Sequence, residues 1–267
     1  MKTLAEVERV PGVALKVKLP QFKANVFPGS GSPALVLVAG GRPPNAQWLA
    51  QLCQGKDTWA VDKGIDVCLS AKIIPSLFIG DRDSASMNGI LWARNNRVPS
   101  VVFPTEKNMT DLQIALRMVQ ESAKGPDVIL AGVLGGRHDH FFANIFSMIW
   151  AEEEWGVQSR CAADEKEAIF LLKGPGSIEF TGVPAGTLVS TLTLSEKCTG
   201  VNLWGTKWPI ENGTLNIRRP FAVSNIATGT KPGFSDIKNE VSFGVEMSSG
   251  WMGIYITATG IEEKGWI

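Results

Sequence analysis

The feature that most constrains the fold is a regular alternation of short apolar runs with helical stretches between residues 34 and 156. The apolar runs lie at residues 34–39, 59–62, 77–80, 100–103 and 128–133. Runs that lack polar alternation are typical of strands buried on both faces. We therefore predict an α/β fold with a Rossmann-like parallel sheet covered by helices on both sides. The pattern leaves the order of the strands open.

After residue 156 the pattern changes. Short strand-like runs recur between residues 168 and 257, separated by Gly-Pro, Asn-Gly and Pro-Gly turns, and helical periodicity is absent. This texture predicts an all-β sandwich. We expect three parts: residues 1–33 as an N-terminal extension and linker, 34–156 as the α/β domain, and 157–267 as the sandwich. Residues 13–19 fit an amphipathic strand.

Charge and cysteine usage exclude several classes of protein. Lys plus Arg and Asp plus Glu both total 26, so the chain lacks the basic excess of a general nucleic-acid binder. Apolar runs are too short for a membrane span, and the N-terminus lacks the apolar core of a secretion signal. Four widely spaced cysteines indicate reduced thiols. We expect a cytoplasmic protein that binds neither nucleic acid nor a membrane.

Polar loops follow four of the predicted strands. They lie at residues 62–64, 80–84, 106–111 and 135–140, and each contains aspartate. Any one of them is explained as a turn or a helix cap. Because ligands of open α/β sheets bind at the carboxyl ends of the strands, the four loops together predict an active site.

The acidic loops suggest a metal site. Asp81 and Asp83 stand two positions apart, and Asp111 lies in the first turn of a predicted helix. Carboxylates of this kind, completed by water and phosphate oxygens, suit Mg²⁺. The alternatives are an Asx-turn at residues 81–84 and a helix-dipole role for Asp111, behind a capping box of Thr110 and Gln113.

The loop at residues 135–140 suggests a phosphate site. Gly135 and Gly136 permit close backbone approach, and a helix start adds N–H donors. Arg137 offers a bidentate contact to phosphate. Carboxylates, a metal and this turn together predict phosphoryl transfer, although the Walker and protein-kinase motifs are missing.

The order of these motifs resembles the thiamine pyrophosphokinase family. The resemblance covers residues 34–257 and rests on Asp62-Lys-Gly64, Gly80-Asp81-Arg-Asp83-Ser, Thr110-Asp111 and Gly135-Gly136-Arg137-His-Asp139-His with Asn144. In the second half, Gly-Thr-Lys-Trp208-Pro and Ser224-Asn225 look like the family's sandwich motifs.

The resemblance implies transfer of the terminal diphosphate of ATP to the hydroxyl of thiamine, giving thiamine diphosphate and AMP, by a homodimer. Asp81, Asp83 and Asp111 would hold magnesium, and Gly136 and Arg137 would contact phosphate. Asp139 would orient the thiamine hydroxyl or accept its proton. The thiamine would lie at the dimer interface, near Trp208, Ser224 and Asn225. The remaining residues assigned to substrate binding are Asp62, Gly64, Gly80, Gly135 and Asn144.

Three residues depart from the usual motifs. Lys63, Arg82 and Asn108 each make the loop edge more positive than the family pattern. Two other functions therefore stay open: a related diphosphokinase acting on a hydroxymethylpterin, and a non-catalytic sensor that binds nucleotide or thiamine.

Overall fold

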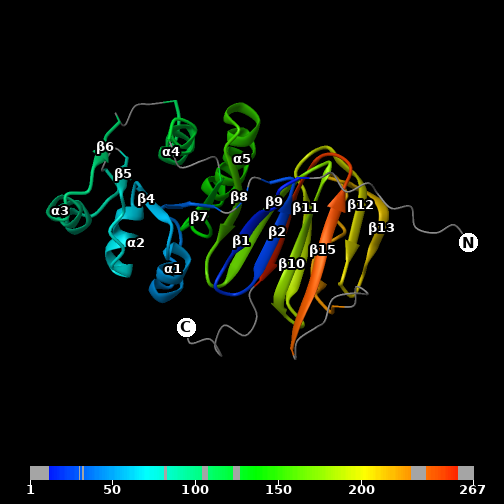
Figure 1. The fold of residues 1–267 in the computed structure, drawn as a ribbon. Coiled ribbons are helices and arrows are strands. Elements are labelled where there is room, and N and C mark those ends of the chain that lie inside the picture. The colour runs from blue at the N-terminus through cyan, green and yellow to red at the C-terminus, as the bar shows by residue number, and fades with distance from the viewer. Residues whose placement is uncertain are drawn as a thin grey trace, which may run out of the picture.

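The computed structural model describes residues 12–29, 31, 33–80, 83–103, 108–122, 127–229 and 239–257. The described part forms two sheets and five helices (Figure 1). The predicted fold class, an α/β part with a parallel sheet followed by a β-sandwich, is confirmed. No helix in these ranges is long and apolar enough to cross a membrane.

The larger sheet has ten strands and runs through both halves of the chain. Its order is β14 (Asn225–Ile226), β11 (Leu188–Thr193), β16 (Trp251–Thr257), β9 (Glu167–Lys173), β8 (Gln158–Ala163), β7 (Asp127–Ala131), β3 (Leu35–Val38), β4 (Asp57–Val61), β5 (Leu77–Ile79) and β6 (Ser100–Val101). Neighbours from β8 to β6 are parallel, and those from β8 to β14 are antiparallel. Backbone hydrogen bonds therefore cross the expected boundary at residue 156.

The smaller sheet is antiparallel and has six strands. Its order is β1 (Leu15–Lys18), β2 (Lys23–Phe27), β10 (Gly176–Pro184), β15 (Glu240–Met247), β12 (Lys197–Trp204) and β13 (Ile210–Asn216). β1 shows the alternating burial expected of an amphipathic strand. The segment that we expected as an N-terminal extension thus supplies two strands of the sandwich, and β2 pairs with β10.

The helices divide between the two faces of the ten-stranded sheet. They are α1 (Ala46–Cys53), α2 (Gly64–Ala71), α3 (Met87–Asn95), α4 (Asp111–Gln120) and α5 (His138–Trp155). Buried residues of α1, α2 and α3 pack with the Val36 and Val38 side of β3, whereas those of α4 and α5 pack with the Leu35 and Leu37 side. This is the two-sided cover that a continuous apolar strand predicts.

The face that α1, α2 and α3 cover is continued in the second half by the smaller sheet, as Figure 1 shows. Phe170 on β9 meets Phe180 on β10 edge to face, with ring centroids 5.1 Å apart. Phe180 in turn stacks on Phe243 of β15 at 4.6 Å. The aromatic contacts join the two sheets into one core.

Three strands, β2, β8 and β14, were not predicted, and in β8 Arg160 interrupts the apolar pattern. The guanidinium is buried and bonds Glu152 of α5 through Nε at 2.7 Å and Nη2 at 2.5 Å. It also donates to the carbonyl of Pro28 at 2.8 Å. A charge at a core position is tolerated when it is paired and hydrogen-bonded, so the strand forms despite its sequence.

Candidate functional site

The carboxyl ends of β3 and β7 form the topological switch point of the parallel sheet. β3 lies between β4 and β7, so the connections on its two sides leave in opposite directions. The loops that follow β3 and β7 are joined by backbone hydrogen bonds, from Gly41 N–H to the Gly132 carbonyl at 2.6 Å and from Arg42 N–H to the Leu134 carbonyl at 2.9 Å. Open α/β sheets bind ligands at this position.

Asp62 joins the loops after β4 and β5. Its φ of 53° lies in the left-handed region, and its carboxylate accepts a hydrogen bond from the hydroxyl of Ser84. A Cβ at Gly80 would stand 3.1 Å from the Cα of Asp62, and a Cβ at Gly64 would stand 1.8 Å from the Val38 carbonyl oxygen. Gly80 is therefore required by close packing against Asp62, and Gly64 by close packing against the end of β3.

Asp66, which sequence reasoning missed, positions the helix that follows the second acidic loop. Its carboxylate accepts the Ser86 backbone N–H at 2.9 Å and the Ser86 hydroxyl. Ser86 caps α3 by accepting the Gly89 N–H at 3.0 Å. The only signal in the sequence is an acidic residue in the first turn of α2.

The three predicted magnesium ligands are described only in part. Asp81 lies outside the described residues, as does Arg82. Asp83 is exposed, and Asp111 is half-buried in the first turn of α4, behind the predicted capping box of Thr110 and Gln113, which is present. Within the ranges that the structure describes, no group of three His, Cys, Asp or Glu side chains could hold a metal ion. The predicted donors are all carboxylate oxygens, the chemistry that Mg²⁺ prefers.

The glycine turn before α5 has one packed side and one open side. Gly135 and Gly136 have φ values of 66° and 72°. A Cβ at Gly135 would stand 2.9 Å from the Cβ of Arg42, whereas a Cβ at Gly136 would meet no heavy atom within 4 Å. Asn144 ties the turn to α5 by donating to the Val133 carbonyl at 3.1 Å. The backbone of Gly136 is therefore open to a ligand.

Arg137 and Asp139 form an exposed ion pair at the start of α5. Nε and Nη2 of Arg137 donate to the two oxygens of Asp139 at 3.1 and 2.6 Å. The hydrogen bonds from Arg137 lower the pKa of Asp139 to about 2. In this arrangement Asp139 is a weak base, so it suits orientation of a hydroxyl better than removal of its proton.

Arg42, also missed from the sequence, braces the glycine turn against the second half. It donates to Oδ2 of the buried Asp164 from Nε at 2.8 Å and from Nη2 at 2.5 Å, and it also bonds Glu167. Tyr255 donates its hydroxyl to Glu167. The stem of Arg42 packs on Gly135. The turn, the β8–β9 hairpin and β16 are thus held together.

The predicted sandwich residues lie together at the β14 edge. Asn225 accepts the Trp208 N–H at 3.1 Å and donates to the Trp208 carbonyl at 2.7 Å. Ser224 is held by its N–H, which donates to the Ser190 hydroxyl at 2.9 Å. The Trp208 ring is 55 % exposed, and the ammonium of Lys207 lies 4.7 Å from its centroid. This ring therefore already stacks with one cation and has the chemistry to take another.

The Trp208 group and the glycine turn are separated within one chain. Asn225 lies on β14, five strand steps from β7. At about 4.8 Å per step, the two groups are roughly 24 Å apart along the sheet. One small molecule does not span both.

Comparisons with known proteins point to one family. Residues 49–158 match the sequence model of a family described as "Thiamin pyrophosphokinase, catalytic domain". The thiamine pyrophosphokinase of Bacillus subtilis (strain 168) is 28 % identical over 204 residues, which is 76 % of this chain and 93 % of that protein.

Solved structures show the same fold. The crystal structure of thiamine pyrophosphokinase from Bacillus subtilis superimposes with a TM-score of 0.70 at 22 % identity, covering 84 % of this chain and 99 % of that one. Yeast thiamin pyrophosphokinase gives 0.65 at 16 % identity, covering 88 % and 90 %.

The fold and the site define a protein whose α/β half and β-sandwich half share one sheet. A glycine turn lies at the switch point of this sheet, and the aspartate loops follow the neighbouring strands β4, β5 and β6. The match at residues 49–158 and the Bacillus relative both point to one family. The chain is similar to thiamine pyrophosphokinases in this segment and over most of its length.

Proposed function

We propose that this protein is a thiamine pyrophosphokinase, which transfers the terminal diphosphate of ATP to the hydroxyl of thiamine and forms thiamine diphosphate and AMP. The observation that carries the proposal is the open glycine turn at the switch point, Gly136 with Arg137 beside it. It lies within the segment that matches the catalytic domain of the family.

The thiamine hydroxyl oxygen attacks the β-phosphorus of ATP, and the bond from that phosphorus to the α–β bridging oxygen breaks. AMP leaves with the bridging oxygen, and the hydroxyl proton is released. The Gly136 backbone and Arg137 bind phosphate oxygens and offset their charge. Arg137 then shares its donors between phosphate and Asp139, whose carboxylate accepts a hydrogen bond from the thiamine hydroxyl and orients it.

Mg²⁺ is the cofactor in this proposal. Asp81, Asp83 and Asp111 would hold it through carboxylate oxygens, the ligands that this ion prefers. When bound, the ion offsets negative charge on the polyphosphate. Asp62 holds the neighbouring loops together by accepting a hydrogen bond from Ser84 and by packing closely against Gly80.

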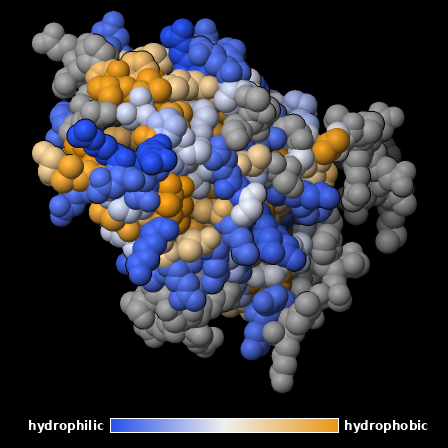
Figure 2. Space-filling view, turned by 60° about the vertical axis from the view of Figure 1, so that its left-hand side comes forward, coloured by the Kyte–Doolittle hydropathy of each residue, from blue (hydrophilic) through white to orange (hydrophobic). Residues whose placement is uncertain are grey.

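The active form in this proposal is a homodimer. The glycine turn and the Trp208 group are too far apart in one chain to enclose one thiamine. A second copy would bring its Trp208, Ser224 and Asn225 to the turn of the first. Phe142, Phe146 and Trp150 recur every four residues on α5 and are 59, 49 and 39 % exposed, which leaves apolar surface for such a contact. Figure 2 shows hydrophobic patches among hydrophilic side chains on the face toward the α/β half.

We place the reaction in the cytoplasm, because Cys53, Cys68, Cys161 and Cys198 are all buried and form no disulfide. Disulfides are typical of proteins that leave that compartment.

The test is incubation of the purified protein with ATP, Mg²⁺ and thiamine, followed by measurement of AMP and thiamine diphosphate. Both products should form in equal amounts. If AMP forms only with 6-hydroxymethylpterin, then the pterin and not thiamine is the substrate. Binding of nucleotide or thiamine without turnover would make the protein a sensor.

A further inference from the structure

A pocket lies at the edge of the sandwich, where the chain crosses from β13 to β14. It has a volume of about 600 Å³ and is lined by Thr214, Asn216, Arg218, Arg219 and Phe221. β13 is the edge strand of the smaller sheet and β14 that of the larger one. The pocket therefore opens on a side of the sandwich where no further strand is paired among the described residues.

Both arginines of this pocket are exposed, and neither forms an ion pair with a described carboxylate. An arginine that has no internal partner keeps its full set of donors for a ligand. Phe221 is 64 % exposed, although a phenyl ring gains free energy from burial. A free guanidinium beside an exposed ring is suited to a ligand that is both anionic and planar.

The backbone that presents these side chains is held by a tight turn. The Arg218 N–H donates to the Asn216 side chain at 2.9 Å, and the Arg219 N–H donates to the Asn216 carbonyl at 2.9 Å. Pro220 follows, which restricts Arg219 to extended conformations. The backbone at the rim of the pocket therefore loses little conformational freedom when a ligand binds.

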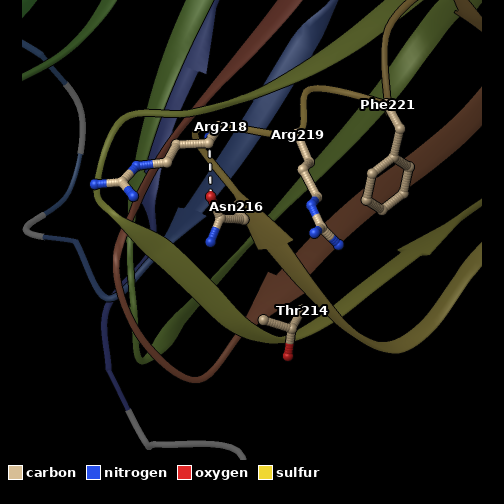
Figure 3. Close-up of a pocket in the computed structure, with 5 residues that line it drawn as sticks. All are labelled: Thr214, Asn216, Arg218, Arg219 and Phe221. Carbon is tan, nitrogen blue, oxygen red and sulfur yellow. Dashed lines mark hydrogen bonds between the residues drawn. The ribbon is translucent and has the colours of Figure 1, made fainter.

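Figure 3 separates the roles of the two arginines. Arg219 and Phe221 extend side by side, and Thr214 lies beyond the end of the Arg219 side chain. Arg218 extends the other way from the turn. The contact surface of the pocket is thus Arg219, Phe221 and Thr214, while Arg218 contributes mainly its charge.

We propose that this pocket binds a phosphate monoester or diphosphate attached to a planar ring. The guanidinium of Arg219 would pair with the phosphate, as arginine does in bidentate recognition. The ring of Phe221 would cover one face of the heterocycle, and the Thr214 hydroxyl would hydrogen-bond a phosphate oxygen. AMP and thiamine diphosphate are two sources of this chemistry.

This pocket and the Trp208 group share no residue. Asn216, at the end of β13, lies six residue steps of about 3.3 Å, or roughly 20 Å, from the start of that strand, which Trp208 precedes. Phe221, on the other side of the pocket, is three residues from Ser224. Variants of Arg219 therefore test the pocket without changing a residue assigned to thiamine.

The test is calorimetric titration of the whole protein, in EDTA, with AMP, thiamine diphosphate, inorganic phosphate, adenosine and thiamine. AMP, thiamine diphosphate or both should bind at least about tenfold more tightly than their unphosphorylated forms, because a charge-assisted hydrogen bond is lost. Inorganic phosphate should bind more weakly than the ring compounds. The relative affinities of AMP and thiamine diphosphate identify the source.

Variants assign the binding to the pocket. Arg219→Ala should weaken it at least about tenfold, and Phe221→Ala about fivefold. Arg218→Ala is the matched control, with the same charge change and an effect below about threefold. Equal losses in R218A and R219A would mean diffuse attraction and overturn the proposal, as would absence of binding.

Arg137→Ala distinguishes this pocket from the glycine turn. Binding that persists in R137A and is lost in R219A belongs to the pocket. Binding that is lost in R137A and persists in R219A belongs to the glycine turn and overturns the proposal. Turnover is measured in parallel on the unaltered protein. If the protein shows no turnover but the Arg219 pocket still binds its ligand, then the proposed function is refuted and the pocket proposal stands.

Discussion

Arg42 and Asp164 lie 122 residues apart in the chain, and two hydrogen bonds of 2.8 and 2.5 Å join them beside the glycine turn. The Asp164 side chain is 1 % exposed and that of Arg42 is 31 % exposed. Burial raises the pKa of Asp164 above its usual value, and the hydrogen bonds from Arg42 oppose this rise without cancelling it. The pair joins the α/β half to the sandwich half at the proposed site.

Arg42→Ala should lower the free energy of unfolding by about 3 kcal/mol, because it leaves a buried carboxylate without its cation. Urea denaturation measures the loss. Arg42→Ala combined with Asp164→Asn is the control and should recover part of the stability. A loss below about 1 kcal/mol in the single variant would show that the pair contributes little.

Tyr255 is the only tyrosine of the chain, so its ionisation can be followed by near-ultraviolet absorbance without interference from another phenol. Burial, followed by the hydrogen bond to Glu167, raises its pKa from 10.0 to about 12. A raised pKa means that the contribution of the neutral phenol to stability is fully present below pH 10 and is lost as the pH rises through about 12.

Glu167→Gln should lower the pKa of Tyr255 toward the ordinary value, because the carboxylate that opposes ionisation is removed. An unchanged pKa would leave burial as the sole cause.

Gly136→Ala should abolish most turnover, because a methyl group would stand where phosphate approaches. Gly156, the C-cap of the same helix, is a matched control, since its φ is 67° and an alanine Cβ there would also meet no heavy atom within 4 Å. Both alanine variants should lose about 1 kcal/mol of stability through left-handed strain. Steady-state kinetics should show a large loss only for G136A, and equal activities would place the phosphate elsewhere.

Asp83→Ala should reduce metal-dependent turnover at least about a hundredfold, the effect of losing one electrostatic stabiliser of a transition state. The exposed Glu154 on α5 offers a control of similar charge, and E154A should keep normal rates. The assay is AMP release at saturating ATP over a Mg²⁺ titration. Near-normal rates in D83A would refute the metal role of this residue.

Mixing two variants tests the dimer. Asp83→Ala damages the α/β half and Trp208→Ala the sandwich half, so a site built from two chains is restored in half of the positions of each mixed dimer. After exchange of an equal mixture, about a quarter of the sites are intact. The kcat/KM for thiamine of the mixture should exceed the values of both parent variants. An activity no greater than the summed activities of the two parents would contradict a site shared between chains.

Local sequence patterns predicted the helices and most strands because their causes are local. The capping box of Thr110 and Gln113 and the caps at Asn45 and Ser86 depend on residues within one turn. The glycines of the loops were also visible, since close packing and positive φ exclude other residues. Asp66 and Arg42 were not visible, because their partners come from distant parts of the chain.

By itself, the amino-acid sequence determined the element types, the fold class and the identity of the polar loops, since periodicity and turn chemistry act over a few residues. Only the tertiary structure decided that β8 joins both halves into one sheet and that β1 and β2 belong to the sandwich. It also decided that Trp208 lies five strands from the glycine turn. These relationships depend on strand pairing between distant segments, whose free energy is set by packing that no local pattern records.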